Sequence, residues 1–531
     1  MAEICELLTN TTHVMSKFYF PSLMLAAALI FTGCDDENDP GKKGAPKGGG
    51  NPQMFAAVIN EGEAMKAENY GGKTKWVADE EVNVNGTVMN VRPNATDPTT
   101  AVLLIDEENG MPDLTSGMIK AIFPAEFASG GKDDPIKGTF APYLLPERGE
   151  ADAEKLDGIL PMYAQGTEQA LDFKNLCGLL EVQIKAARYN VYPKVESITL
   201  QDGKAPLSGP FTVDAGGSAV ITQGEGLDYA VIDCDGKKIS ANQTSFHIAL
   251  APGTYEDLTV IVKADDRPAY YRMKLEKPLT IERAKKTSLL LENVNLAPDG
   301  TTGRAFQINA NGDMVFFAKG NLWADATNPD YPVYHLENSQ IAYPTELKTN
   351  HMAHFFWTSQ AGAAALLKEP EDLLKAEYGK THFVDATKPS LIVKGYEETP
   401  WRMLGYDEWV YLRKASEDIC TIVPDAYVAG VKHCLILGPR KVAIKSSYTA
   451  DEWEKAEANG VVCLPPAGFR DNGQLREQGN WGWYWTGTPD ENKGKYDKAY
   501  MAYFGNLVGS PNISRQAAET IRLVTPVILQ D

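Results

Sequence analysis

The side chains best suited to chemistry in this sequence are aromatic, and they gather near its C-terminal end. Between residues 481 and 504, eight of twenty-four residues are aromatic, whereas the average over the chain is 9%. Aromatic side chains supply large, rigid contact surfaces at low entropic cost, as at interface hot spots and in paratopes. They also stack on the faces of sugars. This segment therefore indicates binding rather than catalysis.

Alternation along a strand divides such residues between core and surface. If Trp483 and Trp485 point inward, Trp481, Tyr484 and Thr486 point outward, towards a target. Beyond them lie polar loop residues that are suited to adaptable hydrogen bonding. The candidate target-binding residues are Trp481, Tyr484, Thr486, Tyr496, Asn506, Asn512 and Arg515. The alternative, open for each of them, is an ordinary place in the core or in a solvated loop.

Metal-binding and catalytic patterns are weak in this chain. His351 and His354 could share one helical face, but no third ligand follows at a suitable spacing, which favours ordinary structural histidines. The acidic stretch 490–492 lacks the second triplet through which lectins hold calcium. Neither a Gly-x-Ser-x-Gly motif nor a phosphate-binding loop is present. We therefore expect no metal, no catalytic residue and no enzyme activity.

The elements that must position the aromatic segment follow from periodicity. Two helices are predicted, one over 407–413 with Trp409 and Leu412 on one face, and one over 449–459. Thr449 and Glu452 form a capping box for the second helix. Upstream, residues 53–297 show period-two runs separated by Gly-containing turns, which is typical of antiparallel β-sandwiches. The expected fold class is mostly β.

Part of this β-rich region resembles the fimbrillin-like (Mfa-like) proteins of Bacteroidetes. The similar stretches are residues 122–124, 160–164, 171–184, 198–200, 206–209 and 250–255. The resemblance implies two tandem transthyretin-like β-sandwiches, over 53–170 and 171–297. It also implies partners, namely other fimbrillin subunits that assemble by donating a β-strand to a neighbour.

The remainder, 298–531, resembles a Bacteroidetes surface family with an α+β C-type-lectin-like fold, the Fibrobacter-type major paralogous domain. The similar stretches are residues 316–322, 401–409, 464–470, 482–486, 499–504 and 521–524. Enzymes that generate formylglycine share this fold and use a pair of cysteines. Cys434 and Cys463 are present here, but their surroundings do not match those of that pair.

The N-terminal residues predict export and lipidation. Residues 15–34 contain a short positive region and an apolar run that ends in Phe31-Thr-Gly-Cys34, which resembles a bacterial lipobox. We expect a signal peptide over 1–34 with a covalent lipid on Cys34 as the sole added group. The acidic residues 35–39 resemble a surface-export signal, and 35–52 forms an acidic, Gly/Pro-rich tether. The expected location is the outer membrane, at the cell surface or a fimbrial tip.

Net charge and cysteine content further limit the kind of protein that this chain can be. The formal net charge of -20 excludes an ordinary nucleic-acid-binding protein, because phosphate contacts need a basic face. Cys5 is lost with the leader and Cys34 carries lipid, so five cysteines remain. Cys177 lies in an apolar run, which favours a buried free thiol. Spacing alone leaves a Cys434–Cys463 bridge open.

Together these features predict a fimbrial tip or accessory adhesin. A whole domain follows the second sandwich, and it would block further subunit addition on that side. The target would be a host or bacterial surface protein or a glycan. Two alternatives remain, a surface glycan-capture lipoprotein that works with an outer-membrane transporter and an enzyme of the formylglycine-generating type.

Overall fold

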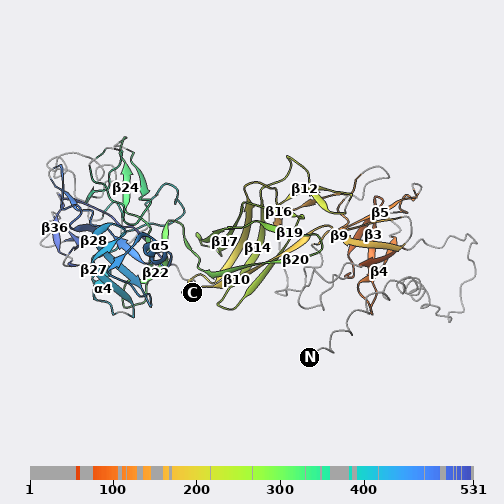
Figure 1. The fold of residues 1–531 in the computed structure, drawn as a ribbon, viewed down its shortest axis with the longest axis horizontal. Coiled ribbons are helices and arrows are strands. Elements are labelled where there is room, and N and C mark those ends of the chain that lie inside the picture. Colours follow the sequence, from red (N-terminus) through yellow and green to blue (C-terminus); the bar gives the residue numbers. More distant parts are fainter. Residues whose placement is uncertain are drawn as a thin grey trace, which may run out of the picture.

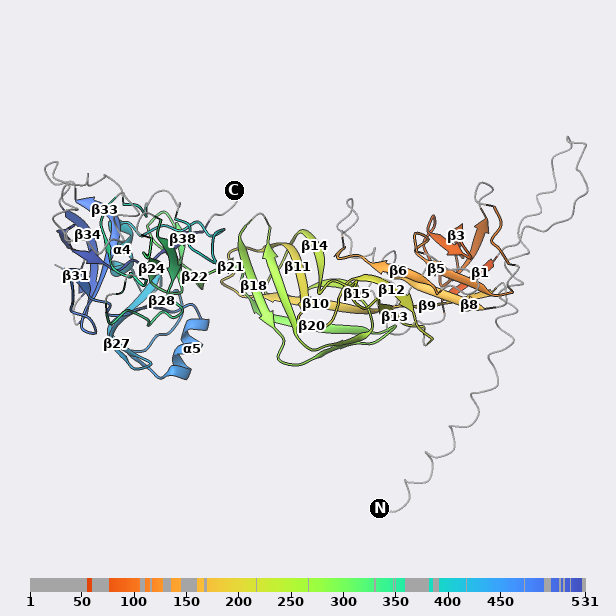
Figure 2. The same cartoon turned by 90° about the horizontal axis from the view of Figure 1, so that it is seen from above.

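The computed structural model shows three β-rich units in a row (Figures 1 and 2). Two α-helices accompany the strands among the described residues, which confirms the mostly β fold class. Cys34 with the leader and tether, Tyr496 and Asn506 lie outside the part that the structure describes. That part comprises residues 55–59, 76–105, 110–114, 117–127, 135–144, 160–166, 170–215, 217–265, 267–328, 331–346, 348, 350–358, 382–384, 391–416, 418–471, 473–490, 498–505, 508–509, 511–515 and 517–527.

The first unit is a closed ring of seven strands in the order β1-β4-β3-β2-β5-β8-β9. Strand β1 closes the ring, because it pairs antiparallel with β4 and parallel with β9. Trp76 fills the interior, where its ring meets Phe123 and Phe173 edge to face. The strands are β1 Phe55–Ile59, β2 Glu81–Val84, β3 Thr87–Pro93, β4 Thr100–Ile105, β5 Ile119–Phe123, β8 Met162–Gly166 and β9 Ala170–Asn175.

The second unit is a β-sandwich. Its sheets have the orders β15-β10-β20 and β21-β18-β17-β11-β14-β7, and their buried residues form one apolar cluster. The period-two residues Leu180, Val182 and Ile184 lie in this core, as the alternation predicts. The strands are β7 Tyr143–Leu144, β10 Gly178–Ala186, β11 Lys194–Asp202, β14 Tyr229–Lys238, β15 Thr244–Leu250, β17 Leu258–Ala264, β18 Ala269–Lys274, β20 Lys286–Val294 and β21 Ala297–Pro298.

Two strands that precede residue 170 connect the first two units. Strands β6 and β7 precede residue 170 in the chain, yet they pair with β12 and β14 of the second unit. One apolar cluster also joins Ile122 and Phe140 to Leu179 and Phe211. The chain therefore crosses between the two units more than once. The strands of the smaller sheets are β6 Lys137–Phe140, β12 Gly209–Val213, β13 Ala219–Ile221, β16 Gly253–Tyr255 and β19 Leu279–Ile281.

The third unit contains both helices, α4 Tyr406–Lys414 and α5 Ala450–Ala458. Trp409 and Leu412 are the buried side of α4, as predicted. At the start of α5 the predicted capping box is confirmed, because the Thr449 hydroxyl accepts from the Glu452 amide and the Glu452 carboxylate accepts from the Thr449 amide.

Five small sheets surround these helices, with the orders β22-β23-β38, β24-β25, β26-β37-β31-β32, β29-β27-β28-β30 and β33-β34-β35, the last with β36 beside β34. Their strands are β22 Thr301–Gln307, β23 Met314–Ala318, β24 Leu322–Asp325, β25 Val333–Leu336, β26 Phe355–Phe356, β27 Cys420–Val428, β28 Val431–Pro439, β29 Ser447–Tyr448, β30 Val462–Leu464, β31 Phe469–Asp471, β32 Gln474–Arg476, β33 Gly482–Asp490, β34 Lys498–Phe504, β35 Val508–Gly509, β36 Asn512–Ser514, β37 Ala518–Glu519 and β38 Val524–Pro526.

The second and third units are joined by packed contacts. Phe316 of β23 belongs to the apolar core of the second unit and stacks on Tyr192 at 6.1 Å between ring centroids. The Arg304 guanidinium lies 3.8 Å from the ring centroid of Tyr189. The apolar contact continues the core of the sandwich across the junction, so the third unit is braced rather than tethered.

Candidate functional site: an aromatic rim on the third unit

Strand β33 carries the aromatic residues that the sequence singles out, and both of its faces are buried at Tyr484 and Trp485. Tyr484 is fully buried in one apolar cluster, where its hydroxyl donates to the Pro465 carbonyl at 2.9 Å. Trp485 is buried in another cluster, and its ring N–H donates to the Phe355 carbonyl at 2.7 Å. The strand thus separates two cores within the third unit.

The outward orientation predicted for Tyr484 and Thr486 is therefore wrong. Thr486 is also fully buried, and its hydroxyl donates to the Tyr500 carbonyl at 2.8 Å. Alternation predicts exposure only where one face of a strand meets water, and β33 has no such face at these positions.

Arg515 is buried as well, contrary to the predicted place in an exposed loop. Its guanidinium lies 3.9 Å from the centroid of the Trp357 ring, and its Nε donates to the Lys498 carbonyl at 3.1 Å. It braces β34 from within. Asn512 is exposed on β36, and its side-chain amide donates to the Asp490 carboxylate at 2.6 Å. Whether any of these residues contacts a target stays a prediction.

The half-buried aromatic residues form a different group, which we call the rim cluster: Phe469, Trp481, Trp483 and Tyr503. Trp483 lies opposite Tyr503 in the β33–β34 register, with ring centroids 6.0 Å apart. Phe469 and Trp483 lie 4.7 Å apart, and Trp481 and Tyr503 lie 5.7 Å apart. The rings of this cluster are therefore partly exposed.

A glycine in the backbone leaves room for one ring of the rim cluster. Gly505 lies under the Trp481 ring, and a Cβ at this position would meet that ring at 2.9 Å. Sequence reasoning found Trp481 and missed Phe469 and Tyr503 as members of the same cluster. The cross-strand register brings these residues together, and no local pattern in the chain contains that information.

A buried carboxyl group lies next to the rim cluster. Glu519 of β37 stands opposite Phe355 on one side and Phe469 on the other, and paired residues of adjacent strands point to the same face. Its side chain is fully buried, and neither carboxyl oxygen has a hydrogen-bond partner among the described residues. Burial without a partner raises the pKa of Glu519 well above its usual range.

The histidines of the third unit occupy two unlike environments. The Trp323 ring is stacked between His335 and His351, at centroid distances of 4.2 and 4.4 Å. His351 also contacts the Glu337 carboxylate at 2.6 Å. His354 is buried, with its Nε2 beside the Ala467 carbonyl at 2.9 Å, and burial lowers its pKa to about 4.

His351 and His354 therefore have different hydrogen-bond partners, Glu337 and the Ala467 carbonyl. Among the residues that the structure describes, no group of three His, Cys, Asp or Glu side chains is arranged to hold a metal ion. The two cysteines that an enzyme of the formylglycine-generating type would use, Cys434 and Cys463, are both fully buried. Burial removes these thiols from contact with a substrate.

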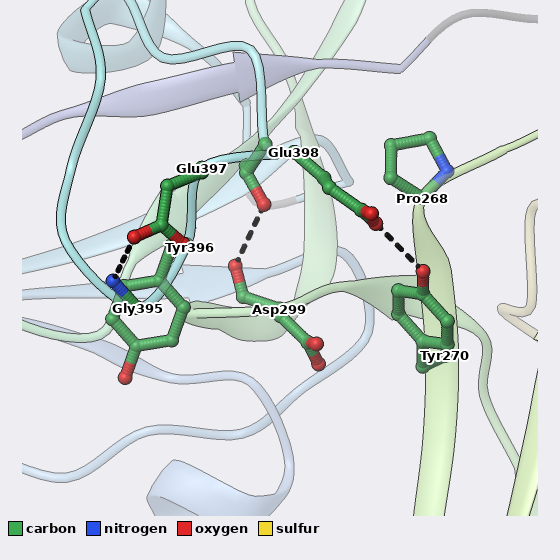
Figure 3. Close-up of a pocket in the computed structure, with 8 residues that line it drawn as sticks. Pro268, Tyr270, Asp299, Gly395, Tyr396, Glu397 and Glu398 are labelled. Carbon is green, nitrogen blue, oxygen red and sulfur yellow. Dashed lines mark hydrogen bonds between the residues drawn. The ribbon is translucent and has the colours of Figure 1, made fainter.

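A cavity of about 180 Å³ lies at the junction of the second and third units (Figure 3). Glu398 accepts a hydrogen bond from the Tyr270 hydroxyl at 2.8 Å, and Glu397 accepts from the Gly395 amide at 2.9 Å. The Thr399 hydroxyl donates to the Asp299 carbonyl at 3.1 Å. Since its polar groups already bond to one another across the junction, this cavity belongs to the packing between units.

Comparisons with known proteins give structural similarities only. No protein-family model matches the chain, and no curated protein matches it. A crystal structure of a candidate cell adhesion protein from Bacteroides ovatus is similar with 16% identity and a TM-score of 0.33, covering 46% of this chain and 94% of that one. A similar candidate adhesion protein from Bacteroides uniformis has 11% identity and a TM-score of 0.29, covering 46% and 93%.

A fimbrial protein from Bacteroides ovatus is similar over a longer stretch, 88% of this chain and 97% of that one, with 10% identity and a TM-score of 0.21. At such scores the similarities carry no functional inference.

Within the described ranges, no helix is long and apolar enough to cross a membrane.

Proposed function

We propose that this chain is a cell-surface adhesin, a tip or accessory subunit of a fimbria. It is anchored to the outer membrane through a lipid on Cys34, assembles with fimbrillin subunits by exchange of a β-strand, and binds its target through the third unit. The target is a surface protein or a glycan of a host or a bacterium. Strand β1 is the observation that carries the assembly part of this proposal.

Strand β1 has the features of a strand that a neighbour's strand can replace. Phe55, Ala57 and Ile59 are buried in its interior, while the residues between them are less buried. The strand pairs along its length with β4 on one side and β9 on the other. Without β1, the ring would open into a slot with two unpaired edges and three apolar pockets. A strand of alternating pattern from a neighbour would fill such a slot.

The position of the third unit supports the tip role. In Figures 1 and 2, the first unit with β1 lies at one end of the row and the third unit lies at the other. The acceptor slot and the rim cluster are therefore far apart, so assembly through the slot leaves the rim cluster accessible. The packed junction at Phe316 keeps the third unit pointing away from the assembly.

Glycan capture with an outer-membrane transporter is the second candidate, and the half-buried rings of the rim cluster favour it. Both functions use the same surface, and they differ in whether the chain joins filaments. Catalysis of the formylglycine-generating type is disfavoured by the burial of Cys434 and Cys463.

Immunogold electron microscopy of the native organism tests this proposal, with an antibody raised against residues 298–531. We expect label at the ends of filaments, with none along their shafts. Label spread over the outer membrane with no filaments would reject the fimbrial role and favour glycan capture. A strain that lacks the chain provides the control for antibody specificity.

A further inference from the structure

Two of the five described cysteines lie together. Cys434 of β28 and Cys463 of β30 belong to the same buried apolar cluster, between their sheet and helix α5. Cys177, Cys234 and Cys420 each lie in a different cluster, with no second thiol in it. The pair is therefore distinct from the other three cysteines in having a thiol neighbour.

The strand register places the two cysteines on the same face. Strands β28 and β30 are antiparallel, with Ile436 opposite Cys463. Cys434 is two residues before Ile436 on the same face of β28, so it is the diagonal neighbour of Cys463. Both thiols are free in this structure. Burial raises the pKa of the Cys463 thiol, and the neighbouring Cys434 raises it further.

Strand β28 is irregular directly before Cys434, so the pair departs from the geometry of an ideal diagonal pair. His433, directly before Cys434, has a φ of 57°, and the β27–β28 register shifts around this point. Such bulges increase the local twist of a strand. Cys463 is fixed in place, because its amide donates to Gln340 at 2.9 Å and its carbonyl accepts from Arg522 at 2.9 Å.

We propose that Cys434 and Cys463 form a disulfide in the exported protein. The inference rests on the export part of the proposed function, since disulfides persist in oxidising compartments and are rare in the cytosol. The bond would close an excursion of 28 intervening residues that includes α5. Closing such a loop limits the unfolded chain and stabilises the sheet next to the rim cluster.

The oxidant is the disulfide of a thiol–disulfide oxidoreductase. The thiolate of one cysteine attacks this disulfide and forms a mixed disulfide, which releases one oxidoreductase thiolate. The second cysteine then attacks its partner's sulfur and releases the other. Two protons and two electrons thus pass to the oxidoreductase, which ends as a dithiol. Burial raises the pKa of the Cys463 thiol in the folded protein, so the exchange occurs during folding, before the pair is covered.

The test uses the full chain, exported into an oxidising bacterial periplasm, alkylated under denaturing conditions and digested with trypsin without reductant. We expect peptides 433–440 and 456–470 to be recovered joined, and separated by reductant. The three remaining core thiols should be alkylated. Recovery of both peptides alkylated and separate would overturn the proposal.

Thermal unfolding supplies a second measurement, in which each protein is compared with itself in the presence and absence of reductant. The result therefore does not require a variant to be as stable as the wild type. Reductant should lower the melting temperature of the third unit by roughly 5–10 °C in the wild type and in Cys420→Ala, the matched control. It should leave that of Cys434→Ala unchanged. A wild-type melting temperature that reductant does not alter would contradict the bond.

Failure of this proposal and failure of the proposed function are distinguishable. Cell fractionation of the native organism reports export, whereas the linked peptides report the bond in a host that exports the chain by design. A chain found in the native cytosol would reject the surface role even where the bond forms in the test host.

Discussion

Replacement of Glu519 by Gln should remove a pH dependence from the stability of the third unit. Glu519 is fully buried between Phe355 and Phe469, and its carboxyl oxygens have no partner among the described residues. Burial raises the pKa of Glu519 well above its usual range, so the folded protein retains a proton that the unfolded chain releases.

The sign of the effect follows from proton binding. Between the unfolded pKa, near the ordinary value of 4.5, and the raised folded pKa, the folded state binds more protons. Stability is therefore highest at low pH within this window and falls as pH rises, by up to about 1.4 kcal/mol per pH unit. Above the folded pKa the loss is complete and the dependence on Glu519 ends. Glu519→Gln keeps the size and polarity of the side chain but cannot ionise.

Urea unfolding at a series of pH values from 5 to 8 measures this effect. Tryptophan fluorescence reports mainly on the third unit, because eight of the nine tryptophans follow residue 300. The wild type and the control Glu454→Gln, an exposed change on α5, should lose stability with rising pH more steeply than Glu519→Gln. Equal slopes in Glu519→Gln and the wild type would refute the assignment of a buried, proton-bearing carboxyl group.

Three further predictions address the rim cluster, the first unit and the histidine stack. Trp481→Ala should weaken target binding by more than about 1 kcal/mol in a binding titration while changing stability little, whereas Tyr484→Ala should unfold at lower urea. Phe55→Asp puts a charge inside the ring at β1 and should lower the stability of the unassembled first unit, whereas incorporation into filaments, seen by co-purification with other subunits, should be retained because a neighbour's strand replaces β1. Desolvation lowers the pKa of His335, which lies against Trp323. The pKa of His335 measured by NMR titration should therefore lie below 6.5 in the wild type and rise in Trp323→Leu.

Local sequence patterns predicted the individual strands and helices of this protein better than the contacts between them. The capping box at Thr449 and the alternation at Leu180 involve residues close in the chain, so sequence alone identifies them. The rim cluster joins Phe469, Trp483 and Tyr503 from three strands, and it depends on register. The prediction for Tyr484 failed because alternation says which residues share a face and does not say whether that face meets water.

The contacts between units bear on how an adhesin of this shape would act. A binding unit on a loose tether would reorient before force reached its target contact, whereas one that shares a core with its neighbour transmits force directly. Phe316 lies in the core of the second unit although its strand belongs to the third. Arg272 pairs with Asp299 at 2.8 Å, and the Tyr270 hydroxyl donates to Glu398. Because Phe316 is buried in this shared core, pulling the units apart would expose its ring to water, so the junction resists separation.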